Sequence, residues 1–234
     1  TNPCSQLKRP MTIPGRDLEG RPLRHAAAGC QRRSAWPLRH CRRWMESSVP
    51  RFEPRETPEP WLVLRNFVSE AERSLLLESA MKQKVQGKLL PNPAGPHRFF
   101  RRLDTTGGVD ALIEALTQRL ELSVVGLQGR PRDETLGRVC SYIEPKGFIH
   151  EHRDKYISPS GPVALAHLRA NIVVQMDQSG RPIIAGKTVP VEEGDVWIFF
   201  ASHELHATGT IEGPKPRIVF GFGWSVPMGF TLHG

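Results

Sequence analysis

The feature that most constrains the fold is a succession of short β-type runs in the second half of the chain. From residue 137 onward, apolar and β-branched residues gather in short stretches separated by turn-forming pairs such as Ser179-Gly180 and Gly213-Pro214. The stretches are residues 137–145, 168–176, 182–191, 195–202, 204–212 and 217–224. Many short strands in succession predict a β-sandwich or barrel.

Two helices are predicted before this β-rich region. Ser69 and Glu72 form a capping-box pattern ahead of a helical segment that includes residues 73–83. Residues 109–121 have the apolar spacing of a second helix. Further strands are expected at 61–67 and 97–105. The predicted fold class is therefore α+β, mainly β, with the N-terminal helices packed on one side.

The N-terminal segment differs from the rest in composition. The chain has a formal net charge of +8, and residues 1–44 hold ten Lys or Arg and two acidic residues, whereas residues 45–234 hold twenty-two of each sign. Residues 1–60 are rich in Arg and Pro and lack a sustained apolar period, so we expect a disordered basic extension. It is a basic tail, a targeting peptide, or sequence upstream of a start at Met45. The predicted folded domain is residues 61–234.

Cysteine use and hydropathy bear on compartment and partners. The four cysteines form no CxxC pair, so neither a disulfide framework nor a structural zinc site is expected. The sequence has no run of eighteen apolar residues, and no apolar stretch follows the first basic residues, so we expect no membrane span and no secretory signal. These features lead us to expect an intracellular, cytoplasmic protein.

The first motif with chemical meaning is His152-Arg153-Asp154. In an extended strand, residues i and i+2 point to the same face, so an imidazole and a carboxylate can bind one cation. An exposed polar turn is the simpler alternative. His150-x-His152 also resembles the start of a cupin metal site, although the glutamate which that pattern requires a few residues later is absent.

The second motif begins at the Gly194-Asp195 turn before an apolar strand. His203 and His206 follow the strand, and Arg217 opens the last β-run. A second histidine would complete a site of two histidines and one carboxylate, which leaves positions on iron(II) open. A guanidinium at the start of an apolar strand suits a bidentate carboxylate contact, although a solvated strand end is the plainer interpretation of Arg217 alone.

Together these motifs resemble the iron(II)- and 2-oxoglutarate-dependent oxygenase superfamily, over about residues 61–226. The resemblance implies a double-stranded β-helix, or jelly roll. It implies that His152, Asp154 and His206 bind iron(II), that Arg217 holds the distal carboxylate of 2-oxoglutarate, and that Tyr142 lies near this co-substrate. The implied activity is a dioxygenase reaction in which O2 drives decarboxylation of 2-oxoglutarate to succinate and CO2.

Two departures leave alternatives open for these assignments. The step from His206 to Arg217 is eleven residues, one more than the commonest family spacing, and Lys215 is a possible substitute for the arginine. His203 is a rival for the distal metal ligand. We prefer His206, because the family histidine usually follows a short loop and directly precedes the strand that leads to the arginine.

Two substrate classes are consistent with the resemblance. A prolyl-hydroxylase-like enzyme would hydroxylate a protein side chain or an amino-acid-like small molecule, whereas an AlkB-like enzyme would demethylate nucleic acid. The second class normally has another arginine soon after the first, and residues 218–234 contain none. The segment 45–234 is neutral, and phosphate binding needs clustered cations. We therefore favour hydroxylation, although residues 97–102 are locally basic and aromatic.

A binding role without catalysis is the remaining possibility, as in a cupin-like or inactive jelly-roll module. Within the run 164–175, Arg169 and Asn171 share a strand face and could meet substrate or co-substrate, or form structural contacts between strands. Ala170, Ile172 and Val174 alternate with them and are expected to face the core.

Overall fold

The computed structural model describes residues 58–134, 136–155 and 165–233. They contain two α-helices, α1 (Glu70–Val85) and α2 (Ala111–Ser123), the short 3-10 helix η1 (Gln178–Gly180), and eleven strands. Apart from residues 58–60, the predicted basic extension lies outside the described residues. None of the helices in the described part of the chain is long and apolar enough to cross a membrane.

The strands form two antiparallel sheets. The larger sheet has the order β1 (Trp61–Leu64), β9 (Val196–Phe200), β6 (Leu165–Gln175), β11 (Arg217–Pro227), β4 (Arg138–Ile143), β3 (Arg98–Arg102), β2 (Leu90–Pro91). The smaller sheet has the order β5 (Ile149–His152), β10 (His206–Thr208), β7 (Pro182–Ile184), β8 (Lys187–Thr188). The predicted jelly roll with a mainly β composition is therefore confirmed.

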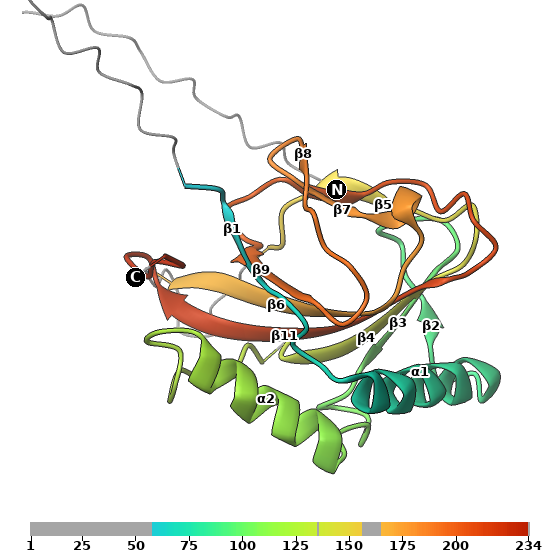
Figure 1. Ribbon diagram of the computed structural model, residues 1–234, viewed down its shortest axis with the longest axis horizontal. Coiled ribbons are helices and arrows are strands. Elements are labelled where there is room, and N and C mark those ends of the chain that lie inside the picture. The colour runs from blue at the N-terminus through green and yellow to red at the C-terminus, as the bar shows by residue number, and fades with distance from the viewer. Residues whose placement is uncertain (1–57, 135, 156–164, 234) are drawn as a thin grey trace, which may run out of the picture. The chain divides into compact units, whose positions relative to one another are not determined.

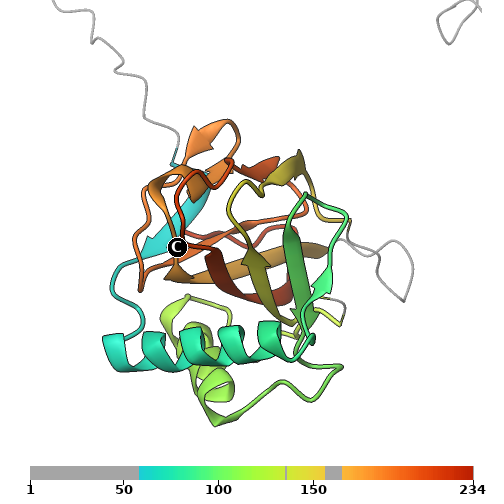
Figure 2. The same ribbon diagram turned by 90° about the vertical axis from the view of Figure 1, so that its right-hand side faces the viewer.

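Both helices cover one face of the larger sheet, as Figures 1 and 2 show. The main core lies between the two helices and this face of the sheet. It includes Leu76 of α1, Leu116 and Leu120 of α2, and the helix-facing residues of β6 and β11, among them Ala170, Ile172, Val174, Phe220 and Trp224. The predicted core face of β6 is confirmed. The opposite face of the large sheet is also buried, because it faces the smaller sheet through a second apolar cluster.

The start of α1 is fixed by the predicted capping box. The Ser69 side chain accepts a hydrogen bond from the Glu72 backbone N–H, and the Glu72 carboxylate accepts one from the Ser69 N–H at 2.8 Å. Arg119 of α2 reaches the same carboxylate at 2.5 Å, so this pair also joins the two helices. Hydrogen bonding from Arg119, reinforced by Ser69, outweighs burial and lowers the pKa of Glu72 to about 2.

Two predicted strands differ from the structure. The run 182–191 is the hairpin β7–β8, because Ala185 and Gly186 both adopt positive φ angles, of 49° and 75°, as a two-residue hairpin turn requires. The run 204–212 is extended only at β10. We expected His152 and Asp154 to lie on one strand. The strand β5 ends at His152, however, and Asp154 lies just beyond it.

Candidate active site

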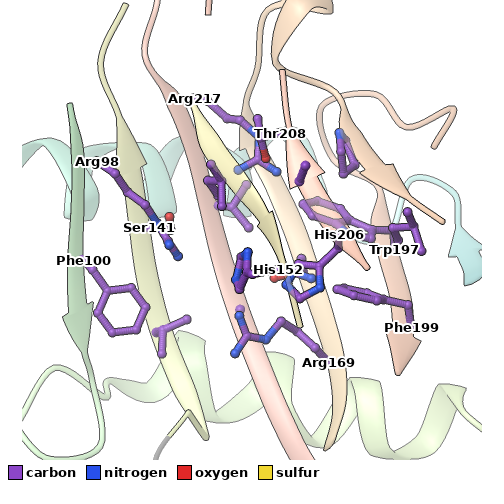
Figure 3. A pocket seen from close by; sticks show the side chains of 18 residues that line it. Arg98, Phe100, Ser141, His152, Arg169, Trp197, Phe199, His206, Thr208 and Arg217 are labelled. Carbon is purple, nitrogen blue, oxygen red and sulfur yellow. The ribbon is translucent and has the colours of Figure 1, made fainter. Parts of the chain in front are cut away.

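A cavity lies between the two sheets, lined by inward-facing residues of both (Figure 3). On the larger sheet, alternate residues point into it because side chains of a strand alternate between faces. These are Arg98 and Phe100 on β3, Val139 and Ser141 on β4, Arg169 and Asn171 on β6, Trp197 and Phe199 on β9, and Arg217, Val219 and Gly221 on β11. The smaller sheet contributes residues that include His152, Ile184, His206 and Thr208.

Pairing of β5 with β10 brings the first predicted ligands together. His152 and His206 are directly opposite in the register, and their ring centroids are 4.3 Å apart. The Asp154 Oδ1 atom lies 3.6 Å from His152 Nε2 and 3.9 Å from His206 Nε2. One potential ligand atom from each residue lies within 4.8 Å of the others. These three residues could therefore hold one metal ion.

Backbone contacts orient both imidazoles for this role. The Nδ1 atom of His152 is 2.7 Å from the His150 carbonyl oxygen, and that of His206 is 3.1 Å from the Glu204 carbonyl oxygen. A carbonyl only accepts, so Nδ1 carries the proton and Nε2 keeps its lone pair for a metal. Burial lowers the pKa of His206 to about 4, against opposing contributions from Glu204 and Asp154, so its ring is neutral at pH 7.

The Asp154 carboxylate is held by charge and by backbone. The backbone N–H of Asp154 donates to the Ala201 carbonyl at 2.8 Å, and the Oδ2 atom of its side chain forms a 2.9 Å ion pair with Arg169 Nη2. Burial alone would raise the pKa of this carboxyl, but Arg169 and the imidazoles of His167, His206 and His152 outweigh it, so the pKa is lowered. Asp154 is therefore ionised, as a metal ligand must be.

Arg217 opens β11 inside the same cavity. Its side chain is 3% exposed, and its Cζ atom lies 5.4 Å from the Trp197 ring centroid. Among the described residues, its Nε atom has no hydrogen-bond partner and no carboxylate pairs with it. Burial, with a contribution from Arg98, lowers the pKa of Arg217 to about 9, which leaves it charged at pH 7. A buried cation with free donors is suited to binding an anion.

Several other predicted residues lie elsewhere. Tyr142 packs in the core on the helix side of β4, with its ring 5.5 Å from Lys84 Nζ, whereas its neighbour Ser141 faces the cavity. This position does not fit the predicted contact with the co-substrate, because adjacent strand residues point to opposite faces. His203 and His150 are exposed and outside the three-residue group. Lys215 is exposed as well, so Arg217 provides the buried cation.

The structure also reveals cavity residues that the motifs did not identify, notably Arg98, Ser141 and Thr208. A further buried pair lies beside Asp154: the His167 Nδ1 atom is 3.0 Å from Asp133 Oδ2, and His167 Nε2 is 3.8 Å from Asp154 Oδ2. Alternation from Arg169 would have placed His167 on the inner face of β6, but a single histidine at a strand start carries no distinctive signal.

No family model matches the sequence, and neither does any curated protein. Solved structures do resemble it. A prolyl-4-hydroxylase of Pseudomonas putida is 16% identical over 73% of this chain and 94% of its own, with a TM-score of 0.53. HygX of Streptomyces hygroscopicus, solved with nickel, 2-oxoglutarate and hygromycin B, is 14% identical over 74% and 85%, with a TM-score of 0.50.

A third similar structure is the epimerase SnoN in complex with Fe3+, alpha ketoglutarate and nogalamycin RO. It is 13% identical over 72% of this chain and 79% of its own, with a TM-score of 0.54. At such identities the likeness establishes the fold. The chain therefore has the jelly-roll fold of the iron(II)- and 2-oxoglutarate-dependent oxygenases. Two histidines and a buried arginine line the cavity between its sheets, and the Asp154 carboxylate lies beside the two histidines.

Proposed function

We propose that the protein is an iron(II)- and 2-oxoglutarate-dependent dioxygenase. It hydroxylates a protein side chain or an amino-acid-like small molecule and converts 2-oxoglutarate and O2 to succinate and CO2. One observation carries this proposal: His152 and His206, which form a three-residue group with Asp154, line the same cavity as Arg217, a buried cation that has no acidic partner among the described residues.

The donor set fits iron(II). Two imidazoles present free Nε2 atoms toward one ionised carboxylate, and such a facial arrangement leaves coordination positions for a bidentate co-substrate and O2. Arg217 fits the distal carboxylate of 2-oxoglutarate, because a guanidinium can donate two parallel hydrogen bonds to it. When bound, iron and 2-oxoglutarate supply the O2 activation and C–H oxidation, which protein side chains alone do not provide.

The other residues of the chain position and shield these groups. Arg169 holds the second oxygen of Asp154 at 2.9 Å and so leaves the first toward the two histidines. Trp197 and Phe199 form an apolar wall beside Arg217 and His206, with the Phe199 and His206 ring centroids 4.9 Å apart. Such a wall excludes water and strengthens the charged contacts inside.

Hydroxylation is favoured over nucleic-acid demethylation for two reasons. The resembling structures include a prolyl-4-hydroxylase and two proteins solved with small molecules, HygX with hygromycin B and the epimerase SnoN with nogalamycin RO. The basic segment 97–102 is also less available to phosphates than its sequence suggested. Arg98 is buried in the cavity, and Arg101 donates to Thr106 at 2.8 and 2.7 Å.

Anaerobic titration with iron(II) and 2-oxoglutarate tests the proposal. A weak visible charge-transfer band should appear in the wild type, and aerobic incubation should release succinate. His152→Ala and Asp154→Ala should lose both signals, whereas Lys155→Ala, at an exposed neighbouring position, should keep them. A wild-type protein that shows no band and releases no succinate would exclude the oxygenase function and leave a binding module.

A further inference from the structure

A second buried arginine, Arg98, faces the same cavity as Arg217. Arg98 on β3 and Arg217 on β11 are both paired with Ile143 of β4, one on each side. Directly paired residues project from the same face of a sheet, so both guanidinium groups enter the cavity at the same level. The two backbones are two strand spacings apart, about 10 Å. The two arginines therefore reach the cavity from different strands of its wall.

Arg98 also lacks an acidic partner in the described part of the chain. Arg98 is only 8% exposed. Its Nη1 atom donates to the neutral Asn92 amide oxygen at 3.2 Å, and its Nε atom has no hydrogen-bond partner. Its Cζ atom lies 5.8 Å from the Phe100 ring centroid. Burial and the charge of Arg169 outweigh the opposing charge of Asp154 and lower the pKa of Arg98 to about 10, so the group stays cationic at neutral pH. A buried cation without an anion is costly to the apoprotein.

Ser141 provides a second free donor beside Arg98. It is the next inward-facing residue of β4, paired with Phe100, which makes it a diagonal neighbour of Arg98 across the two strands. Its Oγ atom is buried and has no hydrogen-bond partner. In Figure 3 the Arg98 side chain extends toward Ser141 along the cavity wall. A guanidinium and a hydroxyl thus converge, and together they can donate to one carboxylate.

The charges of the proposed active complex leave Arg98 unbalanced. Iron(II) and Arg217 together carry as much positive charge as Asp154 and dianionic 2-oxoglutarate carry negative charge. Both carboxylates of the co-substrate are committed, one to the metal and one to Arg217. Asp154, which also forms an ion pair with Arg169, is already counted in this balance and has no further negative charge for Arg98. The anion that would balance Arg98 is therefore neither a side chain of the described residues nor the co-substrate.

We propose that Arg98 and Ser141 form a carboxylate subsite for the substrate, so that the molecule oxidised carries a carboxylate close to the reacting C–H group. This inference rests on the proposed function and narrows its substrate class. The planar edge of the guanidinium favours the planar, two-oxygen shape of a carboxylate. The carboxylate belongs either to an acidic side chain of a peptide or to the α-carboxyl end of an amino-acid-like molecule.

The first experiment separates this subsite from the co-substrate site. Dissociation constants for 2-oxoglutarate are measured anaerobically on the iron(II) protein for the wild type, Arg98→Gln and Ser141→Ala. Both variants should stay within about threefold of the wild type. An Arg98→Gln value raised a hundredfold would make Arg98 a co-substrate ligand and overturn the subsite. A wild type that binds no 2-oxoglutarate would instead refute the proposed function.

The second experiment measures probe binding to the protein loaded with Mn(II) and 2-oxoglutarate. N-acetyl-glutamate N-methylamide is compared with its glutamine counterpart, and N-acetyl-alanine with N-acetyl-alanine amide, which tests the side-chain and α-carboxyl sources separately. One acid should bind at least tenfold more tightly than its amide. Arg98→Gln should abolish that preference and Arg98→Lys should restore part of it, while Arg102→Gln, exposed on the same strand, should not change it.

Three results would overturn the carboxylate subsite. The acids and amides could bind equally well to the wild type, neither acid could bind at all, or the preference could survive in Arg98→Gln. Thermal unfolding of the apoproteins controls for folding. Because Arg98 has no acidic partner in the described structure, Arg98→Gln should unfold at or above the wild-type temperature.

Discussion

Replacing Arg217 by methionine separates binding from stability at one position. Methionine keeps an unbranched, apolar side chain at this position but removes the charge and every donor of the guanidinium beside Trp197. In the proposed complex Arg217 holds the distal carboxylate of 2-oxoglutarate. Without ligand, it is a buried cation, 3% exposed, that pairs with no carboxylate of the described residues. The variant should therefore lose the co-substrate and gain stability.

The size of each effect follows from this environment. A hydrogen bond to a charged group contributes about 1.5–3 kcal/mol, so a two-point contact in a buried cavity gives about 3 kcal/mol or more. Since 1.4 kcal/mol is a tenfold change, the dissociation constant for 2-oxoglutarate should rise on the order of a hundredfold. Replacing buried charges with apolar groups often stabilises by about 1 kcal/mol or more, which corresponds to roughly 2–4 °C in melting temperature for a domain of this size.

Two measurements on the same samples check both effects. Anaerobic titration of the iron(II) protein gives the affinity for 2-oxoglutarate. A separate titration without 2-oxoglutarate gives the affinity for iron(II), and this iron(II) affinity should remain within about threefold of the wild type. Thermal unfolding of the metal-free protein gives the stability change. Lys215→Met is the matched control, because Lys215 is exposed outside the cavity and should change neither quantity. A co-substrate affinity unchanged in Arg217→Met, or a less stable apoprotein, would refute this account of Arg217.

Three further predictions concern the distal histidine, the arginine beside Asp154 and the capping box of α1. His206→Ala should abolish iron(II) binding measured by titration, whereas His203→Ala should leave it intact; the reverse would exchange the two assignments. Arg169→Met should weaken metal binding about 10- to 100-fold through loss of the contact with Asp154, with Arg153→Ala as the exposed control. Glu72→Gln should lower the free energy of unfolding at pH 7 by about 1 kcal/mol, discounted for partial exposure. Because the pKa of Glu72 is about 2 when folded against 4.5 ordinarily, this difference should be full above pH 4.5 and vanish as pH falls toward 2, and a constant difference would contradict it.

Much of the architecture could be predicted from local pattern. Alternation on β6 identified the core residues Ala170 and Ile172, and the pair Ser69 and Glu72 located the start of α1. These signals are readable because they depend on residues close in sequence: strand period, helix period and capping. The predicted single strand at 182–191 is interrupted by a tight turn at Ala185. The residue type does not indicate this turn, because an alanine rarely adopts a positive φ.

The candidate site also contains residues that the sequence predicted and one assignment that the structure does not support. His152, Asp154, His206 and Arg217 were predicted from the resemblance to the oxygenase superfamily that their order and spacing carry, and the structure places them in or beside one cavity. The assignment of Tyr142 does not fit, because Tyr142 packs in the core on the helix side of β4, whereas Ser141 faces the cavity. Every residue of β4 is buried. A strand that is covered on both faces has no polar face to mark the cavity side, so the sequence could not distinguish Tyr142 from Ser141.

The sequence by itself determined the two-residue alternation of the strands, the helix start and the set of residues able to bind a metal and a carboxylate. Only the tertiary structure decided which histidine faces Asp154, since the pairing of β10 with β5 brings His206 opposite His152. It also decided that Arg98 is buried beside Ser141 rather than exposed in a basic patch. The physical reason is that sheet pairing and the burial of both sheet faces are set by contacts between residues far apart in the chain.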